Sequence, residues 1–77
     1  MKPGDYYTNG KRVVHLQERA RFGDWHVLIW VSATATSTRQ LFAPADLAVF
    51  LIGHRKLTPA EVRRWVDGGA VPGMVTP

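Results

Sequence analysis

The first part of the chain alternates apolar and polar residues with the period of two that is typical of β-strands. A Thr-rich turn then leads into a further extended stretch that ends at Phe42. We therefore predict a three- or four-stranded antiparallel β-meander over residues 5–43. Its first three strands have strand-forming residues and are separated by turn-forming ones. They occupy 5–8, 11–19 and 24–31.

Two turns join these strands and limit how they pair. Asn9-Gly10 is typical of a two-residue hairpin in which both residues take positive φ, and Gly23 suits a left-handed position. Pairing Arg19 with Asp24 separates the side chains best, because it collects apolar residues on one face. That face carries Val14, Leu16, Trp25, Val27, Ile29 and Val31. The other carries Val13, His15, Gln17, Arg19, His26, Leu28 and Trp30.

The pattern changes to a helical one after the meander. The apolar run 45–52 is interpreted as a short helix, although a buried strand has the same composition. Thr58-Pro59-Ala60-Glu61 is a capping box with proline in the first turn, so it predicts a helix that ends near Asp67. We expect a single α+β domain over 1–77, with one or two short helices within 45–68 packed on one face of the sheet. We expect an irregular tail over 69–77.

Composition narrows the class of protein. The chain has 77 residues, a formal net charge of +4 and no cysteine. This length accommodates one domain, and the lack of cysteine excludes disulfides and thiolate metal sites. No apolar run approaches the roughly 20 residues that span a bilayer, and no signal-peptide pattern is present. We therefore expect a cytoplasmic protein without a membrane partner.

Candidate chemistry is sparse. His15, His26 and His54 are the only imidazoles, and their spacing matches no common metal motif. The six carboxylates are scattered, and neither serine lies in a nucleophile-elbow context. We expect no enzyme activity, no metal and no cofactor.

Binding is the remaining class of function. Trp, Tyr and Arg side chains are typical interface anchors. The candidates for binding a protein are Trp30, His15, His26 and Arg19, on the sheet face that carries Trp30. The alternative is nucleic-acid binding, through this sheet face or through a basic helix; the basic candidates are Arg55, Lys56, Arg63 and Arg64. Burial of Trp30 and Val13 under the C-terminal helices is the structural alternative. A homodimer is a further expectation, because so small a core is marginally stable.

Three segments carry a family resemblance: Gly4–Val14, Gly23–Val27 and Thr38–Leu41. Together they resemble small SH3-like β-meander proteins of high-GC bacteria and their phages. The resemblance covers about 4–43 and implies a strongly bent antiparallel barrel or sheet used as a binding platform. It transfers no catalytic residue, and 45–67 departs from it. The chain is also similar in composition to phage accessory proteins, so we expect one that binds or inhibits a host or phage protein.

Overall fold

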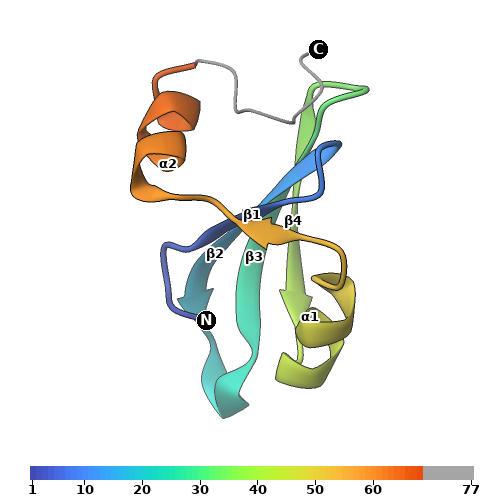
Figure 1. Cartoon of the computed structure of the whole chain (residues 1–77). Coiled ribbons are helices and arrows are strands. Elements are labelled where there is room, and N and C mark those ends of the chain that lie inside the picture. Colours follow the sequence, from blue (N-terminus) through green and yellow to red (C-terminus); the bar gives the residue numbers. More distant parts are fainter. Residues whose placement is uncertain (69–77) are drawn as a thin grey trace.

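The computed structural model describes residues 1–68, which form a five-stranded antiparallel sheet with two α-helices (Figure 1). The order along the sheet is β4-β3-β2-β1-β5. The predicted α+β class with a meander followed by helices is confirmed, and the predicted tail lies outside the described residues. The elements are β1 (Tyr6–Thr8), β2 (Arg12–Arg19), η1 (Arg21–Gly23, a 3-10 helix), β3 (Trp25–Val31), β4 (Thr36–Phe42), α1 (Pro44–Phe50), β5 (Arg55–Lys56) and α2 (Pro59–Val66).

The first hairpin forms where expected, but its turn differs from the prediction. Only Gly10 takes a positive φ, of 92°, because the Asn9 side chain organises the loop instead. Asn9 Oδ1 accepts hydrogen bonds from the backbone N–H groups of Lys11 and Arg12, at 2.9 and 3.1 Å. The Thr8 hydroxyl closes the loop by donating to the Arg12 carbonyl at 2.7 Å. The loop is therefore longer than a two-residue turn.

The predicted pairing of β2 with β3 is correct along most of its length and wrong at one end. Leu16 pairs with Val27, as the Arg19–Asp24 register requires, but the register shifts between Leu16 and Glu18. This β-bulge places Arg19 opposite Trp25 instead of Asp24. A bulge inserts one extra residue on one strand, so side chains beyond it change face. Arg19 consequently lies on the opposite face from the one expected.

The main hydrophobic cluster lies on one face of the sheet, which we call the α1 face. Leu47 of α1 is fully buried against the apolar face predicted from β2 and β3. Phe50, Leu51 and Phe42 pack around this cluster. The residues buried there are Val14, Leu16, Trp25, Val27, Ile29 and Leu47.

The other face, which we call the α2 face, receives the second helix. Trp65 of α2 meets Trp30 edge-on, with ring centroids 4.7 Å apart. Trp30 follows Ile29 in β3, and successive strand residues point to opposite faces. The prediction that both helices pack on one face is therefore wrong, and Figure 1 shows α1 and α2 at different ends of the molecule.

The two helices are separated by β5, which the sequence does not predict. Arg55 and Lys56 pair with Thr8 and Tyr7 of β1, and the Leu57 N–H donates to the Tyr6 carbonyl at 2.8 Å. A two-residue strand has no periodicity to detect, and it exists because β1 offers it an unpaired edge. In crossing this edge, the chain passes from the α1 face to the α2 face.

No helix in residues 1–68 is long and apolar enough to cross a membrane.

Candidate binding surface

Three of the four predicted protein-binding residues share the α2 face. His15 pairs with Leu28, and Trp30 pairs with Val13. His26 lies two residues before Leu28 on β3, so all three side chains point the same way. Trp30 is partly covered by Trp65, so the structural alternative of packing under a C-terminal helix holds for it.

The fourth residue, Arg19, lies on the α1 face because of the bulge. Its guanidinium carbon is 4.9 Å from the centre of the Trp25 ring. Its Nη2 donates to the Gly23 carbonyl at 3.1 Å. These contacts tie the end of β2 to the turn that follows, and they separate Arg19 from the other three candidates.

His15 makes an aromatic contact instead of facing solvent alone. Its ring stacks on Tyr6 with centroids 4.0 Å apart and planes within 2°. Burial lowers the pKa of His15 below its ordinary value of 6.5. The imidazole is therefore neutral at physiological pH and contributes an apolar stacking surface and one donor.

Two of the predicted nucleic-acid residues are bound to carboxylates. The two terminal nitrogens of Arg55, Nη1 and Nη2, donate to the Glu61 carboxylate at 2.9 and 2.8 Å. Lys56 Nζ lies 3.4 Å from Asp5 Oδ1. The hydrogen bonds from Arg55 and from the Thr58 backbone lower the pKa of Glu61 from 4.5 to about 2. Partial burial works in the opposite direction at Asp5, yet hydrogen bonds from Lys2 and Lys56 bring its pKa below 3.8. Much of the charge of Arg55 and Lys56 is thus compensated.

The other two, Arg63 and Arg64, are exposed on α2 and form no ion pair with residues 1–68. A helix–turn–helix arrangement needs two helices joined by a short turn. Here β5 lies between α1 and α2, and the helices cover different faces of the sheet. The two helices of residues 1–68 therefore do not form a helix–turn–helix motif.

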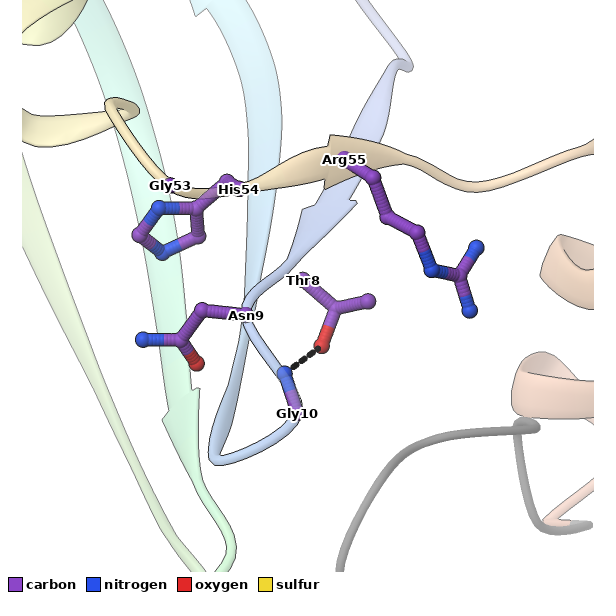
Figure 2. Close-up of a pocket in the computed structure, with 6 residues that line it drawn as sticks. All are labelled: Thr8, Asn9, Gly10, Gly53, His54 and Arg55. Carbon is purple, nitrogen blue, oxygen red and sulfur yellow. Dashed lines mark hydrogen bonds between the residues drawn. The ribbon is translucent and has the colours of Figure 1, made fainter.

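A shallow pocket of about 260 Å³ lies where the first hairpin meets β5 (Figure 2). It is lined by Thr8, Asn9, Gly10, Gly53, His54 and Arg55. No carboxylate lines it, so it holds no acid–base pair of the kind that hydrolases use.

His54 lines this pocket, and its ring contacts two neighbouring side chains of the fold. Its Nε2 accepts from Arg12 Nε at 3.0 Å, and its ring lies 5.8 Å from that of Phe50. Burial and the nearby Arg12 charge lower the pKa of His54. A neutral ring that accepts from Arg12 is unsuited to act as a general acid. Residues 1–68 contain no group of three or more side chains able to hold a metal ion.

Among the large apolar side chains of residues 1–68, Phe22 in the turn between β2 and β3 is the most exposed. It is 98% exposed and has a left-handed backbone with φ 62°. Phenylalanine rarely adopts this conformation, and the Ala20–Asp24 backbone hydrogen bond of 2.6 Å holds the turn in place. A single aromatic side chain at a turn offers a small contact surface. Phe22 is therefore a weaker candidate binding site than an exposed strand.

A second exposed feature is the seven-residue edge strand β4, which the sequence analysis does not name as a candidate. It ends the strand order, and no described residue pairs with its outer side. Every residue of β4 is exposed except Phe42, which is half-buried. The signal was present in the sequence, because this strand-forming segment has no lysine or proline to protect an edge.

The outward-facing backbone groups of β4 follow from the hydrogen-bond alternation of antiparallel strands. The Ser32 N–H donates to the Lys11 carbonyl at 3.0 Å, so Ser32 points toward β2. By alternation, Ile29 and Val31 point toward β4, and their partners there bond back to β3. The residues between those partners direct their N–H and C=O groups away from the sheet. These are Ser37, Arg39 and Leu41.

The same residues place their side chains on the α2 face. Arg39 pairs with Leu28 and Leu41 pairs with His26, and cross-strand partners share a face. Leu41 is 57% exposed. The β4 edge and the uncovered part of the α2 face therefore form one continuous surface, which includes two of the predicted residues, His15 and His26.

Comparison with known proteins adds no relative. Neither the protein-family models, nor the curated proteins, nor the solved structures contain a significant match to this chain.

Proposed function

We propose that this chain is a non-enzymatic protein-binding module, and that β4 takes up an extended segment of its partner as an additional strand. The observation that carries the proposal is the unpaired outer side of β4, with three residues directing their backbone groups outward. Strand addition at an open edge is a common mode of peptide recognition, in which main-chain hydrogen bonds supply the affinity. The partner segment needs no particular fold of its own.

Specificity would come from the α2 face beside the edge. Alternate side chains of an added strand would lie next to Leu41 and Arg39 on this face. Arg39 and the net charge of +4 favour a segment that carries Asp or Glu. The partner is therefore an extended, acidic segment of another protein.

The finer fold class belongs to the same proposal. We infer an SH3-like platform, supported by a four-strand meander whose first strand also accepts the last one, β5. The N-terminal sequence resemblance points the same way. A phage-type accessory protein that binds or inhibits a host or phage protein is the biological setting proposed from that resemblance.

The test uses a proline at an outward position of β4. Ser37→Pro removes one outward N–H but leaves the β3–β4 ladder intact, a placement that edge strands tolerate. Ser37→Ala is the matched control, since it removes the hydroxyl and keeps the N–H. The wild-type chain is used to capture its partner from the native cell, and the partner is identified by mass spectrometry. Binding is then measured with the purified partner.

We expect Ser37→Pro to weaken that binding by about tenfold or more, and Ser37→Ala to change it less than about threefold. Circular dichroism and tryptophan fluorescence establish that both variants fold. A folded Ser37→Pro variant that binds the partner like wild type would show that β4 is not the binding edge.

Nucleic-acid binding is the second candidate, favoured by one observation. Arg63 and Arg64 are exposed on α2 without an ion pair to the described residues. The test is titration of labelled single- and double-stranded DNA and RNA at about 50 mM and 200 mM salt. Binding that weakens with salt and is lost in the Arg63→Ala/Arg64→Ala double variant supports it. No binding at the lower salt concentration excludes it.

A further inference from the structure

We infer that a second copy of this chain occupies the β4 edge, so that two β4 strands pair antiparallel and join two sheets into one. This inference rests on the proposed function, since both require β4 to accept a strand. It goes further by naming the strand that occupies this edge while the acidic partner segment is unbound, and by naming its register.

The two edges of the sheet differ in a way that points to β4. The far edge is β5, which is only two residues long and carries Arg55 and Lys56. Short, charged edge strands resist pairing with another chain. In contrast, β4 has seven residues, a single charge at Arg39 and no proline. One edge of this sheet is thus protected against pairing and the other is not.

Pairing with a second copy would also add stability to a domain whose own core is small. Within residues 1–68, eight apolar residues are buried in the single chain, and no disulfide supplements them. Domains of this size bury a modest fraction of their surface and are often stabilised by association. A two-fold β4 interface extends the sheet and satisfies the outward backbone groups of both copies.

Symmetry restricts how two β4 strands can pair. A two-fold axis perpendicular to the sheet makes the strands antiparallel and keeps the α1 faces of both copies on one side. Residues opposite each other must then point to the same face, so the two-fold axis passes through a residue and not between residues. Thr38, Arg39 and Gln40 are the central choices.

Arg39 decides among these registers. Centring on Arg39 sets it against its own copy, and like charges directly opposite are destabilising. Centring on Gln40 moves the paired segment toward Pro44, where α1 begins. Centring on Thr38 sets Thr38 against Thr38 and Arg39 against Ser37, and leaves α1 beyond the paired segment. We therefore assign the Thr38-centred register.

This register makes a specific prediction about charge at position 37. Ser37→Glu sets a carboxylate opposite Arg39 of the partner, twice in the dimer by symmetry, whereas Ser37→Arg sets two like-charged pairs there. Ala60→Glu, on the exposed start of α2, is the matched control because it changes the net charge away from β4. In the Gln40-centred register, residue 37 lies opposite Ala43, so neither variant forms these pairs.

The experiment is sedimentation equilibrium of the purified full chain, from about 1 μM to 1 mM and at two salt concentrations. We expect wild type to approach twice its 8.6 kDa monomer mass, more readily at the higher salt, because screening weakens repulsion between two positively charged copies. Ser37→Pro is expected to stay monomeric. Ser37→Glu is expected to lower the dimer dissociation constant about threefold to tenfold relative to Ala60→Glu, and Ser37→Arg to raise it.

Several results would overturn the inference. They are a monomeric wild type at every concentration, a dimer that Ser37→Pro leaves intact, or equal effects of Ser37→Glu and Ala60→Glu. The proposed function fails separately, when a captured partner binds the folded Ser37→Pro variant as well as wild type. A monomeric chain whose partner still requires the Ser37 N–H would overturn the second copy and retain the strand-binding module.

Discussion

The two helices of this small protein are held in opposite ways. Helix α1 begins at Pro44, and the residue before it, Ala43, provides no side-chain cap, yet its Leu47 is fully buried in the core. Helix α2 begins with a complete capping box between Thr58 and Glu61, yet none of its residues is fully buried. The helix with the weaker local signals makes the deeper tertiary contact.

This difference shows that a capping signal in the sequence indicates where a helix begins and does not indicate how deeply the helix is buried. A capping box satisfies backbone groups within one turn, so it is visible in four consecutive residues. Burial of Leu47 depends on β2 and β3, which are distant in sequence. Helices shorter than about 12 residues are marginal alone, so α1 depends on packing for its existence.

The largest loss of stability is expected when the buried tertiary contact of α1 is removed. Leu47→Ala removes a fully buried side chain, and such truncations cost about 2–5 kcal/mol. Val49→Ala on the same helix is the control, because Val49 is 68% exposed and should change stability by less than about 0.5 kcal/mol. Urea unfolding followed by tryptophan fluorescence measures both. Equal losses for the two variants would show that α1 does not rely on its buried face.

A smaller loss of stability is expected when the capping box of α2 is removed. The Thr58 hydroxyl accepts from the Glu61 N–H at 3.2 Å, and the Glu61 carboxylate accepts from the Thr58 N–H at 3.0 Å. Thr58→Ala is expected to lower the free energy of unfolding by about 1 kcal/mol. Thr58→Ser keeps the hydroxyl and should retain most of that stability. A Thr58→Ala variant as stable as wild type would mean that the contacts of α2 with the sheet, through Trp65 and Glu61, hold the helix without the cap.

The smallest expected effects are changes of stability with pH, which occur in different pH ranges for the two helical regions. The folded pKa of His54, which follows α1, lies below 6.5, so the unfolded chain binds a proton more readily and stability falls as pH drops below about 6.5. The folded pKa of Glu61, in α2, is about 2 against 4.5. Its contribution is present above pH 4.5 and is lost as the pH falls toward 2.

Unfolding midpoints measured from pH 8 to pH 2 resolve these two windows. His54→Asn should flatten part of the decline below pH 6.5, with His15 accounting for the rest, since burial also lowers its pKa. Glu61→Gln should flatten part of the window between 4.5 and 2, with Asp5 accounting for a further part, since its pKa is also lowered, from 3.8. A Glu61→Gln profile that follows wild type through that window would contradict the assignment.

Much of the fold is predictable from sequence because its signals are local. The meander, the capping box and the register from Arg12 to Leu16 all follow from residue types and alternation. The bulge after Leu16 does not, because an extra residue leaves no mark in a pattern of period two until the pairing is known. Its consequence, the transfer of Arg19 to the other face, could not be foreseen for the same reason.

The candidate surface is less predictable than the fold. His15 and His26 lie where alternation places them, but Trp30 packs against Trp65 from 35 positions away in the chain. The compensation of Arg55 by Glu61 depends on α2 turning back toward β5. That β4 is the open edge of the meander becomes clear only when the strand order is known, because the first and last strands of a meander both lie at edges and β5 covers the first.

The sequence by itself determined the class of the fold, the start of α2 and the lack of cysteine chemistry, since each depends on neighbouring residues or on composition. The tertiary structure decided that β5 completes the sheet, that the helices cover opposite faces and that β4 stays unpaired. These outcomes depend on which distant segments meet, and the free energy of such contacts is absent from any local pattern.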